Sequence, residues 1–157
     1  MLRKFLRSLK QVVNALWFCD VSKETYLDSS VLLCVLHGKG ATFAKSYQII
    51  NEPSRRFLSS DYVRLETLPK PTFYKKQEAL NFLNEFFGKA RIVASDADIT
   101  KAALGLACKH DINAADALHL SSAVAGKATE FVTAEQNTKP VFRATETGVK
   151  LTSIYFP

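Results

Sequence analysis

The sequence is poor in cysteine, and it has no long apolar run. Its three cysteines, Cys19, Cys34 and Cys108, form no CxxC motif and leave one cysteine without a partner in any pairing scheme. We therefore expect neither a disulfide framework nor a zinc site, and a reducing, cytoplasmic location. The apolar runs are far shorter than the roughly 20 residues of a transmembrane helix, so we predict no membrane insertion.

Acidic residues are outnumbered by basic ones. The chain has 15 Asp and Glu against 21 Lys and Arg, which gives a formal net charge of +6 at pH 7. A basic surface attracts polyanions, nucleic acid foremost, although charge alone is a weak indication. With 157 residues, of which 47% are hydrophobic, the sequence is typical of one globular domain that is large enough to form its own core.

The first 22 residues differ in pattern from the rest. Apolar side chains recur at helical spacing between Leu2 and Trp17, and basic residues lie on the opposite side: Arg3, Lys4, Arg7 and Lys10. Such a helix can lie on a membrane surface or dock on a partner, and it can equally be a poorly ordered extension. We favour an accessory helix over a membrane anchor. We therefore divide the chain into a basic amphipathic extension, residues 1–22, and one domain, residues 23–157.

From residue 25 onward, short β-rich segments alternate with helical ones. Strands are expected at residues 25–27, 56–59, 91–93, 130–133 and 150–155. Helices are expected at residues 31–36, 43–51, 61–68, 73–87, 96–109, 114–124 and 140–147. Gly88 is expected to end the helix at 73–87, and Ser95 to cap the next one. This alternation predicts an α/β fold: three α/β/α layers around a central, mostly parallel sheet of four to five strands.

The helix at residues 114–124 is the organising element of the predicted domain. Asn113 can cap it, and Asp116 falls in its first turn, where the helix dipole favours a carboxylate. His119 follows one turn later, and we interpret it as a packed residue rather than a general base. The face expected to pack on the sheet contains Ala117, Leu120, Ser121 and Val124.

Four acids from distant parts of the chain are expected at the carboxyl ends of the strands, where open parallel sheets bind their ligands. Asp28 follows the first strand, Glu66 lies in the helix after the second, and Glu135 lies just beyond the strand at 130–133. Asp116 is the fourth. Each alone has a structural interpretation as a turn residue, a solvated residue or a first-turn charge. Together they would repel one another unless they bind a cation. Mg²⁺ and Mn²⁺ prefer such oxygen ligands and can activate water for phosphodiester hydrolysis.

Four segments resemble the acidic motifs of PIN-domain nucleases, and they occur in the right order. The segments are residues 25–30, 60–66, 115–120 and 131–135. The resemblance covers about residues 24–156 and is greatest to the VapC toxins of toxin–antitoxin systems. It implies a Mg²⁺- or Mn²⁺-dependent endoribonuclease, often a homodimer, that a small antitoxin protein inhibits.

The resemblance also implies roles for individual residues. Asp28, Glu66 and Asp116 would bind the metal, and one carboxylate would help to deprotonate the attacking water. Ser30 would support the site with its hydroxyl, although it can equally cap the helix that follows. Thr133 would orient the fourth acid. That acid is Glu135 here, where the family usually has Asp.

Three alternatives stay open. The replacement at Glu135 favours a weakened PIN module that only binds RNA or a protein partner. A phosphoacceptor receiver domain shares the alternating architecture, but residues 28–30 and 133–135 lack its paired acids and its lysine. Asp96 and Asp98 form a competing metal motif, which we interpret as acids favoured at a helix start.

Overall fold

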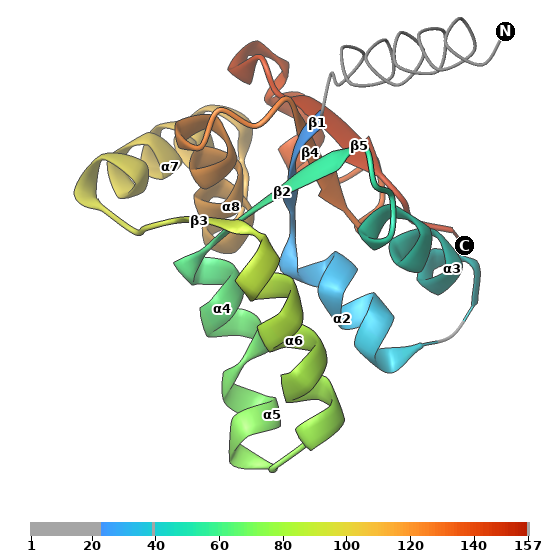
Figure 1. Ribbon diagram of the computed structural model, residues 1–157. Helices are drawn as coiled ribbons and strands as arrows, with labels where there is room; N and C mark the ends of the chain where they lie inside the picture. Colours follow the sequence, from blue (N-terminus) through green and yellow to red (C-terminus); the bar gives the residue numbers. More distant parts are fainter. Residues whose placement is uncertain (1–22, 39, 157) are drawn as a thin grey trace, which may run out of the picture.

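Five short strands form one parallel sheet in the computed structural model, which describes residues 23–38 and 40–156 (Figure 1). The strands are β1 (Lys23–Leu27), β2 (Arg55–Ser60), β3 (Arg91–Val93), β4 (Glu130–Thr133) and β5 (Lys150–Ser153). Their order is β3-β2-β1-β4-β5, and all four pairings between them are parallel. The predicted α/β class with a central parallel sheet is confirmed. The extension predicted at residues 1–22 lies outside the described residues.

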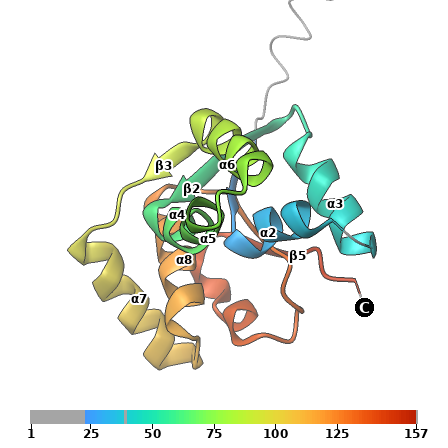
Figure 2. The ribbon, with the colours of Figure 1, turned by 90° about the horizontal axis from the view of Figure 1, so that it is seen from below.

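Helices cover both faces of this sheet. Figure 2 shows α7 (Ala97–His110) and α8 (Ala114–Ala125) on one side, and α2 (Ser29–His37), α3 (Gly40–Ile50) and α6 (Gln77–Lys89) on the other. The short helices α4 (Asp61–Thr67) and α5 (Pro69–Phe73) extend away from the sheet beyond the end of β2 (Figure 1). No helix in the described part of the chain has the length and hydropathy that crossing a membrane requires.

Alternation along the central strands sends side chains into both core layers. Phe57 in β2 contacts Phe86 of α6, with ring centroids 5.9 Å apart. The next residue, Leu58, is fully buried on the opposite face, where α8 ends at Gly126. Successive side chains of a strand point to opposite faces. The five short strands therefore hold two helical layers in place and bring their carboxyl ends to one edge.

Several element boundaries differ from those predicted. The helix expected at residues 73–87 is interrupted, because Lys75 adopts a left-handed φ of 52°; α6 begins only at Gln77 and continues through Gly88. Asp96, rather than Ser95, caps α7, and its carboxylate accepts from the Ile99 N–H at 2.7 Å. The helix expected at residues 140–147 consists of two short 3₁₀ helices, η1 (Pro140–Arg143) and η2 (Thr145–Thr147).

The packed face of α8 is close to the predicted one. Ala117, Leu120 and Ser121 are buried, but Val124 is 40% exposed, so its assignment to the packed face was wrong. Asn113 caps this helix as predicted: its Oδ1 accepts from the Asp116 N–H at 2.9 Å.

Candidate active site

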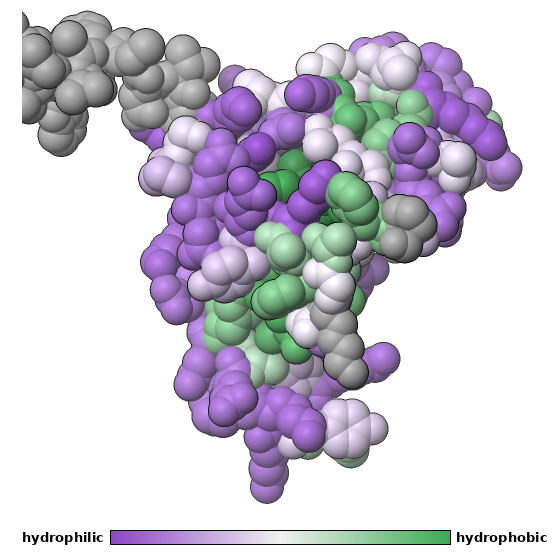
Figure 3. All heavy atoms as spheres, turned by 90° about the vertical axis from the view of Figure 1, so that its right-hand side faces the viewer, coloured by the Kyte–Doolittle hydropathy of each residue, from purple (hydrophilic) through white to green (hydrophobic). Residues whose placement is uncertain are grey.

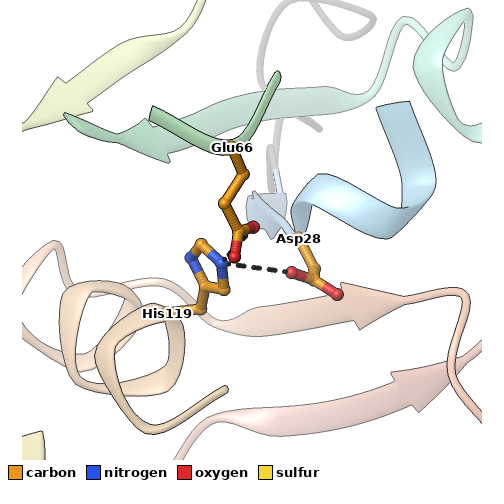
Figure 4. Close-up of side chains that lie close together, drawn as sticks. All are labelled: Asp28, Glu66 and His119. Carbon is orange, nitrogen blue, oxygen red and sulfur yellow. Dashed lines mark hydrogen bonds and ion pairs between the residues drawn. The ribbon is translucent and has the colours of Figure 1, made fainter. Parts of the chain in front are cut away.

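Asp28 joins the end of β1 to the start of α2. Its backbone N–H donates to the Val132 carbonyl of β4 at 3.0 Å, and its side chain makes no capping bond to α2. Instead, its Oδ2 accepts from Ser30 Oγ at 2.6 Å and from Thr133 Oγ1 at 2.8 Å. These two hydroxyls fix the buried carboxylate in one orientation. Its other oxygen, Oδ1, lies 3.6 Å from His119 Nε2 (Figure 4).

Glu66 reaches the same place from α4. Its Oε2 lies 2.9 Å from His119 Nε2, the nitrogen that also faces Asp28 (Figure 4). The hydrogen bond to His119 lowers the pKa of Glu66 and outweighs the partial burial that would raise it. The Glu66 side chain is 37% exposed, whereas Asp28 is buried. The site therefore combines one fixed carboxylate with one that solvent can reach.

His119 is a site residue that the sequence interpretation missed. The ring is packed as expected, at 1% exposure, yet its Nε2 faces two acids. Burial by itself would lower the pKa of His119, but the hydrogen bond to Glu66 and the charges of Asp28, Glu66 and Asp116 outweigh it and raise the pKa. The sequence contained one signal: residues three apart on a helix share a face, and Asp116 lies three before His119.

Two further residues hold His119 in place. The Tyr26 hydroxyl lies 3.1 Å from His119 Nδ1 and 2.6 Å from Ser60 Oγ. Both Tyr26 and Ser60 are fully buried, and the Tyr26 ring stacks on Phe131 with centroids 5.6 Å apart. Burial, together with the charges of Asp28 and Glu66, raises the pKa of Tyr26, so the hydroxyl keeps its proton. No sequence signal distinguished Tyr26 from an ordinary core residue of a central strand.

Asp116 lies at the mouth of α8, bonded to the residue that caps this helix. Its Oδ2 accepts from Asn113 Nδ2 at 2.7 Å. Partial burial and the charges of Asp28 and Glu135 raise its pKa, despite the opposing effect of His119. Asp116 is thus electrostatically coupled to the other acids, but it does not belong to the tight group that Asp28, Glu66 and His119 form.

Glu135 is the most loosely placed of the four predicted acids. Its backbone N–H donates to Thr133 Oγ1 at 3.1 Å, so one hydroxyl group contacts both Asp28 and the segment that carries Glu135. The Glu135 side chain is 43% exposed and its Oε2 lies 3.6 Å from Lys139 Nζ. Its carboxylate therefore lies beside a lysine, while its charge still acts on Asp116.

Three of these side chains lie close enough together to hold a divalent cation. One ligand atom from each of Asp28, Glu66 and His119 lies within 4.8 Å of the other two, and within residues 23–38 and 40–156 no other group of this kind occurs. Carboxylate oxygens are the ligands that Mg²⁺ and Mn²⁺ prefer, and imidazole nitrogen is a common ligand of transition metals. The competing motif stays structural, because Asp96 caps α7 and Asp98 is an exposed residue of its first turn.

A groove of about 870 Å³ runs from Glu66 between α2 and the α5–α6 segment. Its lining includes the apolar side chains of Leu33, Leu36 and Phe82 and the basic residues Lys70, Lys75 and Lys76. On the side of the molecule formed by α2 and α3, apolar residues gather between hydrophilic ones (Figure 3). The groove thus combines Glu66 of the candidate site with apolar and basic lining residues.

Comparisons with known proteins agree with this architecture. A sequence model of the PIN domain matches residues 25–141. A search of curated proteins gives no match. Among solved structures, a chain of VapBC2 from Rickettsia felis, bound to a DNA fragment from its promoter, superposes with a TM-score of 0.62 at 18% identity, covering 82% of this chain and 97% of that chain.

Two other solved structures give similar agreement. A chain of a toxin–antitoxin complex from Klebsiella pneumoniae has a TM-score of 0.65 at 15% identity and covers 85% of this chain and 100% of its own. A chain of DNA-bound VapBC from Salmonella typhimurium has a TM-score of 0.61 at 12% identity and covers 84% of this chain and 98% of its own. At such low identities the likeness establishes the fold.

Proposed function

This chain belongs to the PIN domain family, and we propose that it is a metal-dependent endoribonuclease, the toxin of a toxin–antitoxin pair. The observation that carries this proposal is the meeting of Asp28 and Glu66 at the carboxyl edge of the sheet, around a single imidazole nitrogen. Ionised carboxylates gathered in this way favour a cation. The fold similarity to chains of toxin–antitoxin complexes supports the assignment to this group.

The proposed reaction is hydrolysis of an RNA phosphodiester to a 3′-hydroxyl and a 5′-phosphate. Asp28 and Glu66 would hold Mg²⁺ or Mn²⁺, with Asp116 as a further ligand on the open side of the site. The bound cation would neutralise phosphate charge and lower the pKa of the attacking water. One of the carboxylates would help to deprotonate that water. Glu135 would contribute to the reaction as the fourth acid, from the edge of the site.

Ser30 and Thr133 have supporting roles in this proposal. Their hydroxyls both donate to Asp28 Oδ2, whereas Oδ1 accepts a longer bond of 3.5 Å from Ser29 Oγ that a cation could replace. Thr133 also accepts from the Glu135 N–H. The two residues therefore set the direction of one metal ligand and the path of the chain that bears the fourth acid.

The direct test is cleavage of single-stranded RNA by the purified protein with Mn²⁺ or Mg²⁺. Asp28→Asn and Asp116→Asn should each reduce cleavage by about 100-fold or more, as expected when a group that acts at the reacting phosphate is lost. Asp98→Asn is the matched control, because Asp98 is an exposed first-turn acid of α7. Undiminished cleavage by both site variants would remove the assignment.

One observation favours a second candidate, a weakened PIN module that binds RNA or a protein without cutting. Glu135 stands where the family usually has Asp, and its carboxylate faces Lys139. Calorimetry with Mn²⁺ separates the two candidates. An inert module gives no binding heat and no cleavage, whereas the nuclease gives both.

The proposed protein partner is a small antitoxin that binds the groove beside the site. The apolar wall at Leu33, Leu36 and Phe82 suits the apolar face of an amphipathic helix, and a basic side chain of the partner could pair with Glu66. Co-expression with a small protein encoded next to this gene should yield a complex in which RNA cleavage is inhibited. Leu33→Asp should prevent co-purification while leaving cleavage intact, because Leu33 lines the groove. A complex that survives this change would place the partner elsewhere.

A homodimer and a cytoplasmic location complete the proposal. Light scattering on the purified chain tests the first, and a monomer at all accessible concentrations would exclude it. Fractionation of cells that express the tagged protein tests the second.

A further inference from the structure

We propose that His119 is a direct nitrogen ligand of the active-site cation, and that this ligand makes Mn²⁺ rather than Mg²⁺ the preferred ion. The inference rests on the proposed nuclease function and specifies its cofactor. The starting observation is that a buried imidazole, not a third carboxylate, completes the tight group with Asp28 and Glu66.

The positions of the three ligand atoms suit neighbouring vertices of an octahedron. Around an ion with bonds of about 2.1 Å, adjacent ligand atoms are about 3.0 Å apart. His119 Nε2 lies 2.9 Å from Glu66 Oε2 and 3.6 Å from Asp28 Oδ1. The first distance already fits, and the second corresponds at this bond length to a ligand–metal–ligand angle of about 120°, wider than the ideal right angle. The chosen oxygens of Asp28 and Glu66 lie within 4.8 Å of each other, and Glu66 can adjust this separation because its side chain is partly exposed.

The Nδ1 atom of His119, which faces away from the two acids, is hydrogen-bonded as in a metal-binding histidine. Such histidines usually hydrogen-bond through the nitrogen that does not touch the metal. Here His119 Nδ1 lies 3.1 Å from the Tyr26 hydroxyl, which in turn lies 2.6 Å from Ser60 Oγ. With Nε2 on a cation, Nδ1–H donates to Tyr26 and Tyr26 donates to Ser60. All three residues are buried at 1% exposure or less, so packing and these hydrogen bonds restrain the ring.

This donor set distinguishes between cations. Mg²⁺ is a hard ion that binds carboxylate oxygen and water, whereas imidazole suits transition metals. An all-carboxylate site would accept Mg²⁺ and Mn²⁺ with similar ease. Replacing one oxygen with the His119 nitrogen should therefore raise the affinity for Mn²⁺ relative to Mg²⁺.

Pulsed electron paramagnetic resonance of the full-length protein with one equivalent of Mn²⁺ tests the ligand directly. The wild type should show modulation from a directly coordinated nitrogen. His119→Gln should abolish the modulation and weaken Mn²⁺ binding about 10- to 100-fold, while Mg²⁺ binding, measured by competition, changes less than about threefold. His37→Gln is the matched control, because His37 is an exposed residue of α2 outside the tight group.

Each contrary outcome is decisive. Bound Mn²⁺ without nitrogen modulation in the wild type would overturn the inference, even if His119→Gln failed to fold, and would leave the nuclease proposal standing. Modulation that persists in a folded His119→Gln would assign the nitrogen to another residue and would also overturn it. Absence of both Mn²⁺ binding and RNA cleavage would refute the proposed function itself.

Discussion

The Thr133 hydroxyl donates to Asp28 Oδ2 at 2.8 Å and so links the ends of two adjacent parallel strands. Both residues are buried. The bond spans a large separation in the chain but only one step across the sheet, since β4 pairs with β1. Sheet order therefore determines how the carboxylate is oriented.

Thr133→Val should weaken catalysis more than it weakens the fold. Valine keeps the shape but removes the donor to Asp28 and the acceptor of the Glu135 N–H. The free energy of unfolding should fall by about 1 kcal/mol, whereas cleavage of RNA should fall by about 10-fold or more. Chemical denaturation and a cleavage assay measure the two effects. The exposed Thr100→Val serves as control, and equal activity of both variants would contradict the supporting role of Thr133.

Asp116→Asn should stabilise the protein while it inactivates the site. The folded protein raises the pKa of Asp116 above its ordinary value of 3.8, through burial and the charge of Asp28. Ionising this group therefore costs stability, and the cost appears as the pH rises above that value. At pH 7 in the presence of a chelator, the free energy of unfolding of the variant should exceed that of the wild type. The difference should be less than about 1 kcal/mol, because the site is partly exposed and screened by solvent. A melting temperature of the variant below that of the wild type at pH 7 would contradict the repulsion between Asp116 and Asp28.

Glu130 and Arg55 form a buried ion pair at the opposite edge of the sheet, with each side chain 8% exposed. Burial alone would raise the pKa of Glu130, but the hydrogen bonds from Thr152 and Arg55 and the charge of Arg55 outweigh it and lower the pKa. A carboxylate with a lowered pKa stabilises the fold above its ordinary value, 4.5 here, and this stabilisation is lost as the pH falls through the folded value.

Glu130→Gln should therefore destabilise the protein in a pH-dependent way. At pH 7 we expect a loss of about 2 kcal/mol, because Arg55 loses one of its two carboxylate partners and keeps only Glu52, 2.6 Å away. The difference from the wild type should shrink steadily below pH 4.5, as protonation neutralises Glu130 in the wild type too. Urea titrations at several pH values between these limits measure the difference in the free energy of unfolding. Glu85→Gln, at an exposed pair with Lys89, should show no measurable effect, and a pH-independent loss for Glu130→Gln would refute the explanation.

Gly126 allows the end of α8 to approach the sheet closely. A Cβ atom there would lie 2.7 Å from side-chain atoms of both Leu58 and Val93. Gly126→Ala should therefore destabilise the protein by about 1–3 kcal/mol through overpacking. Gly105→Ala in α7 has open space around it and should instead stabilise by up to about 1 kcal/mol, since alanine favours helices. Thermal unfolding measures the stability change of each variant, and we expect the two changes to have opposite signs.

The sequence by itself determined the elements and the placement of the first acid. Strand–helix alternation, the Asn113 cap and the position of Asp28 at a strand end depend on residues close together in the chain. Hydrophobic period and capping chemistry act over a few residues, so these features could be predicted. Local conflicts limited the accuracy: the left-handed Lys75 interrupts a helical pattern that otherwise continues from Phe73 to Phe87.

Only the tertiary structure decided which side chains share the site. His119 looked like a core residue, because helical periodicity indicates only that it is buried. The contact of Glu135 with Lys139 had no signal in the sequence either. The Tyr26–His119 contact exists because α8 packs against the sheet, and the Asp28–Thr133 bond because β4 lies next to β1. The strand order and helix packing that bring such residues together arise from burying the whole core at once, which no local pattern records.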